Sequence, residues 1–227
     1  MFKELIFFVL LIRLSWYLIR FFYTRYVKVQ KNVQNALVCG NGQECQIIID
    51  ELVERGAKVY YSGQLDIKCN ENCILIENRY DASIFSQISG IPIDSMFLCS
   101  YDENKSKNID MEDSDIVQDI KDNVSGFIFM IKGFVKQSST KKSISVANCM
   151  NRKYSSFIEQ FVHHIQIEGK FNNTTIQLVN THKKTKPKDI AYSMLNSLGT
   201  NYDIDVGFRM PFYRLLKWFA PFNYYIE

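Results

Sequence analysis

The chain has 227 residues, of which 47% are hydrophobic and 22% are charged, and its formal net charge is +3. This length and apolar content can bury one substantial core, so we expect a single folded domain with appendages. The net charge is too small to indicate a nucleic-acid partner, and we expect none.

Six cysteines lie within apolar or strand-like segments: Cys39, Cys45, Cys69, Cys73, Cys99 and Cys149. Disulfide frameworks are typical of small secreted domains that lack a sufficient core, so we expect these thiols to be reduced. Cys69 and Cys73 have no second Cys/His pair at ligand spacing beside them, so no metal site is predicted.

The N-terminus predicts a membrane anchor helix over residues 1–27. Residues 5–23 are mostly Leu, Ile, Phe, Trp and Tyr, which is about the length that spans a bilayer. Arg13 and Arg20 interrupt this run on one helical stripe, so the helix is expected to span the membrane once or to lie in its interface. A helix buried in the core of the domain is the alternative, and a cleaved signal peptide is disfavoured because no cleavage site follows.

Positive charges orient the chain relative to this membrane. Arg20 lies near the end of the apolar run, and Arg25 and a basic linker over residues 28–34 follow it, whereas only Lys3 and Glu4 precede it. The positive-inside rule therefore places the domain in the cytosol.

Strand-like and helix-like segments alternate after the linker. Strands are expected over residues 36–39, 58–61, 73–76, 95–99, 143–147 and 174–179. Helices are expected over 45–55, 83–89, 114–137, 154–168 and 188–198, with a solvated loop over 101–114. The alternation predicts an α/β fold over residues 35–208: a Rossmann-type, doubly wound, mostly parallel sheet in a single domain with helices on both faces.

Residues 36–61 are the most informative segment of this domain. A buried strand, a glycine turn, an amphipathic helix and a second buried strand form the first half of a dinucleotide-binding unit. Gly40, Asn41 and Gly42 are candidate cofactor-binding residues, because glycine lets the backbone approach a diphosphate at the helix N-terminus. The carboxylate of Glu44 would oppose such a diphosphate if it pointed into the turn.

Four stretches resemble the short-chain dehydrogenase/reductase family. They are DELVERGAKV at residues 50–59, IDSMF at 93–97, NVSGF at 123–127 and PKDIA at 187–191. The resemblance extends over about residues 34–227, with no motif intact, and marks the chain as a divergent member. It implies a Rossmann fold, NADP(H) as cofactor and oxidoreductase chemistry.

The family's cofactor turn, Thr-Gly-x-x-x-Gly-x-Gly, falls on Cys39, Gly40, Glu44 and Gln46, so two of its three glycines are replaced. After the strand at 58–61, the segment 62–64 offers neither an acid for a ribose hydroxyl nor an Arg for a 2′-phosphate. Gln64 is the remaining candidate cofactor contact there.

The resemblance also implies a catalytic Tyr, a Lys four residues later and an upstream Ser. The matching Tyr and Lys positions hold Asn151 and Ser155, and no Ser stands at the expected place at the end of the strand at 143–147. Tyr154 is a nearby candidate proton donor, although Ile158 stands four residues on. Asn123 matches the family's helix-bending Asn and is the second catalytic candidate, with a purely structural role as the competing interpretation.

Residues 209–227 predict an aromatic, amphipathic C-terminal helix that contacts the membrane, covers an apolar pocket as a lid, or packs on the domain. An N-terminal anchor with such a tail resembles the membrane-bound lipid ketone reductases. NYDIDVGF at 201–208 is similar to 3-ketodihydrosphingosine reductase, and LNSLG at 195–199 to the 3-ketoacyl-CoA reductase and 17β-hydroxysteroid dehydrogenase branch. This resemblance implies the endoplasmic reticulum membrane and a long-chain lipid substrate.

Three functions follow. The first is a membrane-anchored reductase-fold protein without catalysis, acting as a scaffold or lipid binder, with the bilayer, a lipid or a membrane protein as partner. The second is an active NADPH-dependent reductase of 3-ketosphinganine or a 3-ketoacyl-CoA with replaced catalytic residues. The third is a membrane protein in which anchor and tail are the function and the domain is a spacer. Joint loss of Tyr, Lys, Ser and two glycines favours the first, because proton donation alone contributes about 10²–10⁴-fold in rate.

Overall fold

The computed structural model describes residues 4, 7–12, 14–16, 18–19, 32–63, 66–68, 71–76, 83–99, 117, 120, 124–136, 141–149, 154–168, 173–182, 184–200 and 203–206. The predicted C-terminal helix at 209–227, the loop at 101–114, and the candidates Gln64 and Asn123 lie outside these residues.

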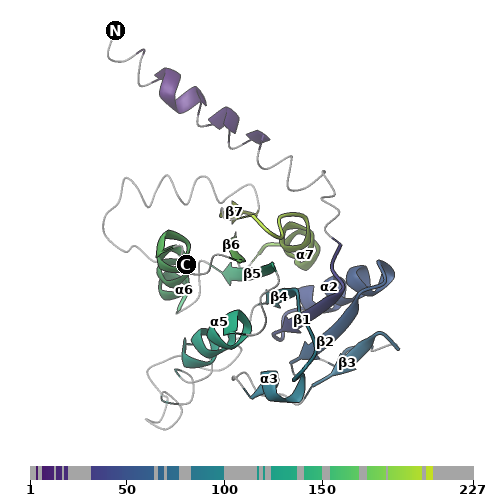
Figure 1. Cartoon of the computed structure of the whole chain (residues 1–227). Helices are drawn as coiled ribbons and strands as arrows, with labels where there is room; N and C mark the ends of the chain where they lie inside the picture. Colours follow the sequence, from purple (N-terminus) through teal and green to yellow (C-terminus); the bar gives the residue numbers. More distant parts are fainter. Residues whose placement is uncertain are drawn as a thin grey trace.

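Seven strands form one sheet in the order β3-β2-β1-β4-β5-β6-β7, and every neighbouring pair is parallel (Figure 1). The strands are β1 (Asn35–Cys39), β2 (Lys58–Ser62), β3 (Cys73–Leu75), β4 (Ser95–Leu98), β5 (Lys142–Cys149), β6 (Thr174–Thr181) and β7 (Ile204–Asp205). The strand order reverses between β1 and β4. In a doubly wound sheet this switch point, at the carboxyl ends of the strands, is where ligands bind.

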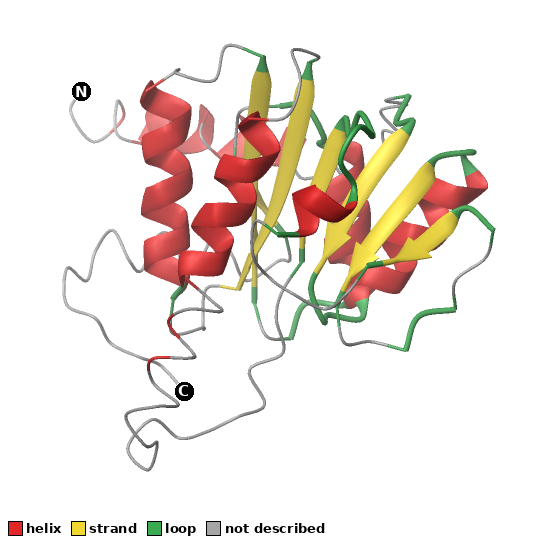
Figure 2. Ribbon diagram, turned by 60° about the horizontal axis from the view of Figure 1, so that its bottom comes forward, coloured by secondary structure: helices red, strands yellow, loops and turns green. Residues whose placement is uncertain are grey.

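Helices cover both faces of the sheet (Figure 2). The described helices are α2 (Glu44–Glu54), α3 (Ile84–Gln87), α5 (Gly126–Lys136), α6 (Ser155–Glu168) and α7 (Pro187–Asn196). Alternate residues of β1 supply two separate cores, because successive side chains of a strand point to opposite faces. Val38 packs in the core that contains α2 and α7, and Leu37 in the core that contains α3, α5 and α6. The predicted doubly wound sheet is therefore confirmed.

Some element bounds differ from the sequence-based expectation. β5 runs to Cys149, because it pairs with β6 along its whole length, up to Cys149 opposite Thr181. α3 spans only four residues, and β7, which was not predicted, spans two. The helix predicted over 114–137 is described from Gly126 to Lys136.

Residues 7–12, 14–16 and 18–19 of the N-terminal segment are helical and exposed. Phe7, Trp16 and Ile19 are 67%, 64% and 62% exposed, which is inconsistent with burial in the core of the domain. The predicted membrane helix is not found in the described part of the chain, where no helix is both long and apolar enough to cross a bilayer. The other residues of the segment 1–27 lie outside the described part.

Candidate functional site

The candidate cofactor turn joins β1 to α2 at the switch point of the sheet. Gly40 is buried, and its φ of +134° is a conformation that favours glycine. A Cβ at Gly40 would lie 2.8 Å from the carbonyl oxygen of Cys99, and the Gly40 N–H donates to the Ser62 carbonyl at 3.1 Å. Gly40 is thus required at the point where the carboxyl ends of β1, β2 and β4 meet.

Glu44 is the first residue of α2 and is 3% exposed. A Cβ added to Gly42 would overlap both carboxylate oxygens of Glu44, so this carboxylate is folded back over the glycine. The negative charge therefore lies inside the turn, at the positive end of the helix dipole.

A second contact closes the turn on the side of β2. The Tyr61 hydroxyl donates to the Gly40 carbonyl at 2.9 Å, and both residues are buried. A Cβ added to Gly63 would overlap this hydroxyl and this carbonyl oxygen. The chain's own atoms thus fill the corner after β2, where a Rossmann fold contacts the ribose.

Gln46, which stands at another replaced glycine, points away from the turn. Its amide nitrogen donates to a carboxylate oxygen of Asp50 at 2.7 Å, and its amide oxygen accepts from the Lys68 N–H at 3.2 Å. Both partners lie on an exposed flank, so Gln46 does not obstruct the turn.

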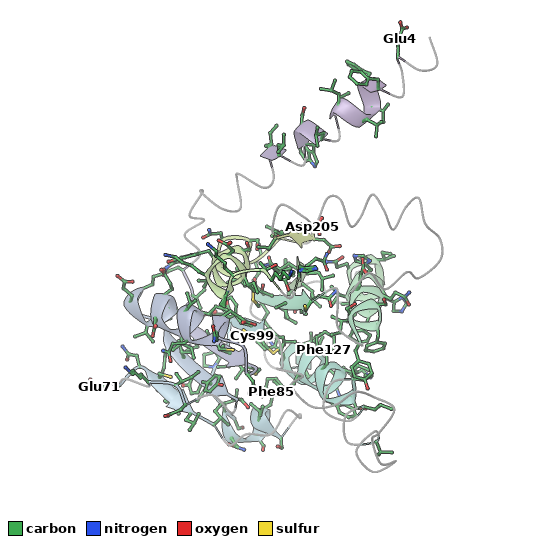
Figure 3. All side chains as sticks on the ribbon, turned by 180° about the vertical axis from the view of Figure 1, so that it is seen from behind. Glu4, Glu71, Phe85, Cys99, Phe127 and Asp205 are labelled. Atoms are coloured by element: carbon green, nitrogen blue, oxygen red, sulfur yellow. The ribbon has the colours of Figure 1, made fainter. Side chains whose placement is uncertain are left out.

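Three buried thiols, those of Cys39, Cys45 and Cys99, surround the turn, and Cys99 lies in the interior of the molecule (Figure 3). Burial raises the pKa of Cys99 well above its ordinary value, and a hydrogen bond with Cys45 and the charge of Glu44 raise it further. Burial also raises the pKa of Cys39 well above its ordinary value. Because the thiolate is the reactive form, the thiols of Cys39 and Cys99 are unsuited to nucleophilic catalysis. The described residues contain no His, Cys, Asp and Glu cluster that could hold a metal ion.

A chain of amides lies at the carboxyl ends of β5, β6 and β7. The Asn148 side-chain nitrogen donates to Asn180 Oδ1 at 3.2 Å, and that of Asn180 donates to Asp205 Oδ1 at 3.2 Å. The Thr181 hydroxyl donates to the Asn148 carbonyl at 3.4 Å. Asn148 and Asn180 are 1% and 0% exposed. An amide does not exchange protons near neutral pH, so these groups can hold the strand ends together but cannot act as general acid or base.

Tyr154, the candidate proton donor, lies immediately before α6 and is partly buried. Its carbonyl accepts the Ile158 N–H at 3.0 Å, which places it in the first turn of the helix. α6 contains no lysine, so the Tyr and Lys pair of the resemblance is absent from this helix. By contrast, Gly40, Gly42 and Glu44 lie together in the turn between β1 and α2.

The amide chain was not predicted from the sequence. Asn148 and Asn180 are 32 residues apart and become neighbours only because β5 and β6 pair in this register. Two asparagines near the ends of expected neighbouring strands were the available signal, but the register is a property of the assembled sheet.

The seven-stranded parallel sheet, with a glycine turn at its switch point, defines a Rossmann-type α/β fold. No protein-family model and no curated protein matches the sequence. Among solved structures, a short chain dehydrogenase from Leptospira borgpetersenii with bound NAD+ has a TM-score of 0.61 and 12% identity, over 77% of this chain and 91% of its own.

Two further structures show the same likeness. A short-chain dehydrogenase/reductase, glucose/ribitol dehydrogenase, from Brucella melitensis has a TM-score of 0.61 and 17% identity, over 78% of this chain and 95% of its own. A short chain oxidoreductase from Pseudomonas aeruginosa PAO1, described as containing an atypical catalytic center, has a TM-score of 0.60 and 11% identity. The match covers 77% of this chain and 95% of that oxidoreductase. At these identities the likeness shows the fold alone: this chain has the fold of short-chain dehydrogenases.

Proposed function

We propose that this chain is a divergent, membrane-anchored member of the short-chain dehydrogenase/reductase family, of the lipid ketone reductase type, that has lost its chemistry and acts as a scaffold or lipid-binding protein. The amide chain of Asn148 and Asn180 carries this proposal. These buried side chains are engaged with one another at the ends of β5 and β6, and the end of β5 is where the resemblance would place a Ser hydroxyl that this chain lacks.

Membrane association is supported by the N-terminal segment. Its described residues are helical, and their large apolar side chains are 44–67% exposed. Apolar side chains exposed on every side of a helix lower their free energy in the hydrocarbon or interfacial region of a bilayer. The endoplasmic reticulum membrane, with the domain on the cytosolic side, is the location that we propose from the charge bias and the resemblance.

An active NADPH-dependent reductase of a long-chain 3-keto lipid is the second candidate. The Pseudomonas aeruginosa oxidoreductase, which has the same fold and is described as having an atypical catalytic center, favours it. In such an enzyme Tyr154 or another group would replace the missing proton donor.

Turnover separates the two candidates. The full chain in detergent would be incubated with NADPH or NADH and with 3-ketosphinganine or a 3-ketoacyl-CoA, while nucleotide absorbance is followed. We expect no oxidation above the rate without protein. Saturable oxidation that Tyr154→Phe abolishes would overturn the non-catalytic proposal and support the reductase.

A further inference from the structure

We infer that Glu44 is an internal anion whose carboxylate takes the place that a dinucleotide diphosphate would occupy in the β1–α2 turn, so that this side chain closes the phosphate part of the site. The inference rests on the proposed non-catalytic function and deepens it, because it names the residue that excludes the cofactor. The ligand class concerned is the nucleoside diphosphate, either free or within a nicotinamide dinucleotide.

The position of the carboxylate is the first argument. Glu44 is 3% exposed, although it is the first residue of a helix that begins at the carboxyl edge of the sheet. Its carboxyl group lies over the bare face of Gly42, where a side chain at that position would project. In a nucleotide-binding turn this bare face lets the phosphate approach the backbone. Here the Glu44 carboxylate makes that approach instead.

The charge of the site is the second argument. α2 has eleven residues, and its N-cap residue, Gln43, makes no side-chain hydrogen bond to the helix. Glu44 is the acidic residue of the first turn, where the positive end of the helix dipole favours an anion. A bound diphosphate and the Glu44 carboxylate would therefore compete for the same positive potential, and they would repel each other if both were present.

The third argument is that the backbone of the turn is otherwise retained. Gly40 keeps its φ of +134°, and the Cys45 N–H donates to the Gly42 carbonyl at 3.0 Å. Gln46 points away towards Asp50 and Lys68. Glu44 is thus the side chain that fills the phosphate position, and its removal leaves a glycine turn at a helix N-terminus.

Nucleotide binding to the full chain in detergent tests the inference. ADP, NADH and adenosine would be titrated into the wild type, Glu44→Ala and Glu44→Gln, with binding followed by calorimetry and by the shift in melting temperature. Glu54→Gln is the matched control, since it removes an exposed carboxylate from the last residue of the same helix.

We expect no saturable binding of ADP or NADH to the wild type or to Glu54→Gln at millimolar concentration. Glu44→Ala should bind both ligands about tenfold or more tightly than the wild type, because the competing charge at the helix N-terminus is gone. Glu44→Gln should show a smaller gain, since its neutral side chain still fills the space. Adenosine, which has no phosphate, should distinguish the variants much less than ADP does.

Equal affinity of the wild type and both Glu44 variants for ADP would overturn the inference, and so would saturable submillimolar binding to the wild type. Failure of both variants to unfold cooperatively would also overturn it, because Glu44 would then be needed for the fold itself. The proposed loss of catalysis is tested separately, by the turnover measurement. Failure of the inference and failure of the proposed function can therefore be told apart. A Glu44→Ala protein that binds NADH without oxidising it leaves both proposals standing.

Discussion

At the scale of single residues, the glycines of the β1–α2 turn are required by contacts within the chain itself. Gly42 lacks a side chain where the Glu44 carboxylate lies, and Gly63 lacks one where the Tyr61 hydroxyl meets the Gly40 carbonyl. A nucleotide-binding sequence pattern can therefore be kept by internal packing alone. The presence of Gly40 and Gly42 does not by itself indicate a bound cofactor.

Coupling between Gly42 and Glu44 measures this packing. Gly42→Ala should lower the free energy of unfolding of the wild type by about 1–3 kcal/mol, because the new methyl group displaces the buried carboxylate. In a Glu44→Ala background the same change should cost less than about 0.5 kcal/mol, and urea denaturation of the four proteins gives the coupling. Additive effects would show that the carboxylate does not lie over Gly42.

Gly40 is predicted to be more sensitive than Gly42. Its neighbours are the backbone carbonyl and Cβ of Cys99, at 2.8 and 2.9 Å from an added Cβ, and a strand end cannot move aside as a flexible carboxylate can. We expect Gly40→Ala to cost about 3 kcal/mol in the free energy of unfolding, from overpacking and from the strained φ together. Gly56→Ala is the control: its φ is +80° but nothing lies within 4 Å of an added Cβ, so about 1 kcal/mol is expected. Equal losses would mean that strain in φ, and not the contact with Cys99, decides the cost.

At the scale of elements, a buried lysine joins α5 to β5. Lys142, the first residue of β5, is 1% exposed, and its Nζ donates to the Phe134 carbonyl at 2.6 Å in the last turn of α5. Burial lowers the pKa of Lys142 below that of an exposed lysine. The ammonium group is favoured at a helix C-terminus, but it loses hydration there.

This lowered pKa predicts a pH dependence of stability. At a pH below its pKa in the folded protein, Lys142 is charged in both the folded and the unfolded chain. The full free-energy cost of burying the charge is then present. Between the folded-state pKa and the ordinary lysine value of about 10.4, the unfolded chain binds more protons, so stability rises with pH. Relative to Lys142→Met, the wild type should therefore gain free energy of unfolding from pH 7 towards pH 10, as measured by urea denaturation of both proteins. A difference that stays constant or falls would contradict the assignment.

Element boundaries show what the sequence predicts and what it does not. The predicted bounds of β1, β2 and α2 each lie within one residue of the observed ones, because polar residues and glycines delimit their apolar runs. β7 has two residues and carries no periodicity of its own, so only its pairing with β6 defines it. Sequence patterns thus predict elements with their own hydrophobic signal but not those that the assembled sheet imposes.

The same division applies to the candidate site. The sequence marks Glu44 as a replaced glycine at a helix N-terminus, but the direction of its side chain depends on the space above Gly42, which only the folded turn defines. The contact between Asn148 and Asn180 likewise depends on strand register. Residue identity thus marked Glu44 but not Asn148 or Asn180, and packing determined what each of these side chains does.

At the scale of the whole molecule, the domain and the N-terminal segment differ in what their apolar residues contact. The two cores of the domain bury their side chains on either side of the sheet, whereas Leu14, at the centre of the apolar run, is 56% exposed on a helix. If a bilayer covers this helix, a charge at its centre costs about 2.5–3.5 kcal/mol on insertion scales. Leu14→Asp should therefore reduce flotation of the full chain with phospholipid vesicles, by about a hundredfold in the partition coefficient.

Leu75→Asp supplies the control for that measurement. Leu75 lies on the edge strand β3 and is 63% exposed, so the same substitution there introduces the same charge on the folded domain. Its flotation should match that of the wild type. Equal partitioning of both variants would mean that the domain, and not the N-terminal helix, holds the chain on the membrane. Loss of flotation only in Leu14→Asp would show that the helix acts as the anchor, and the domain would then be displayed at the membrane surface by a segment outside its own cores.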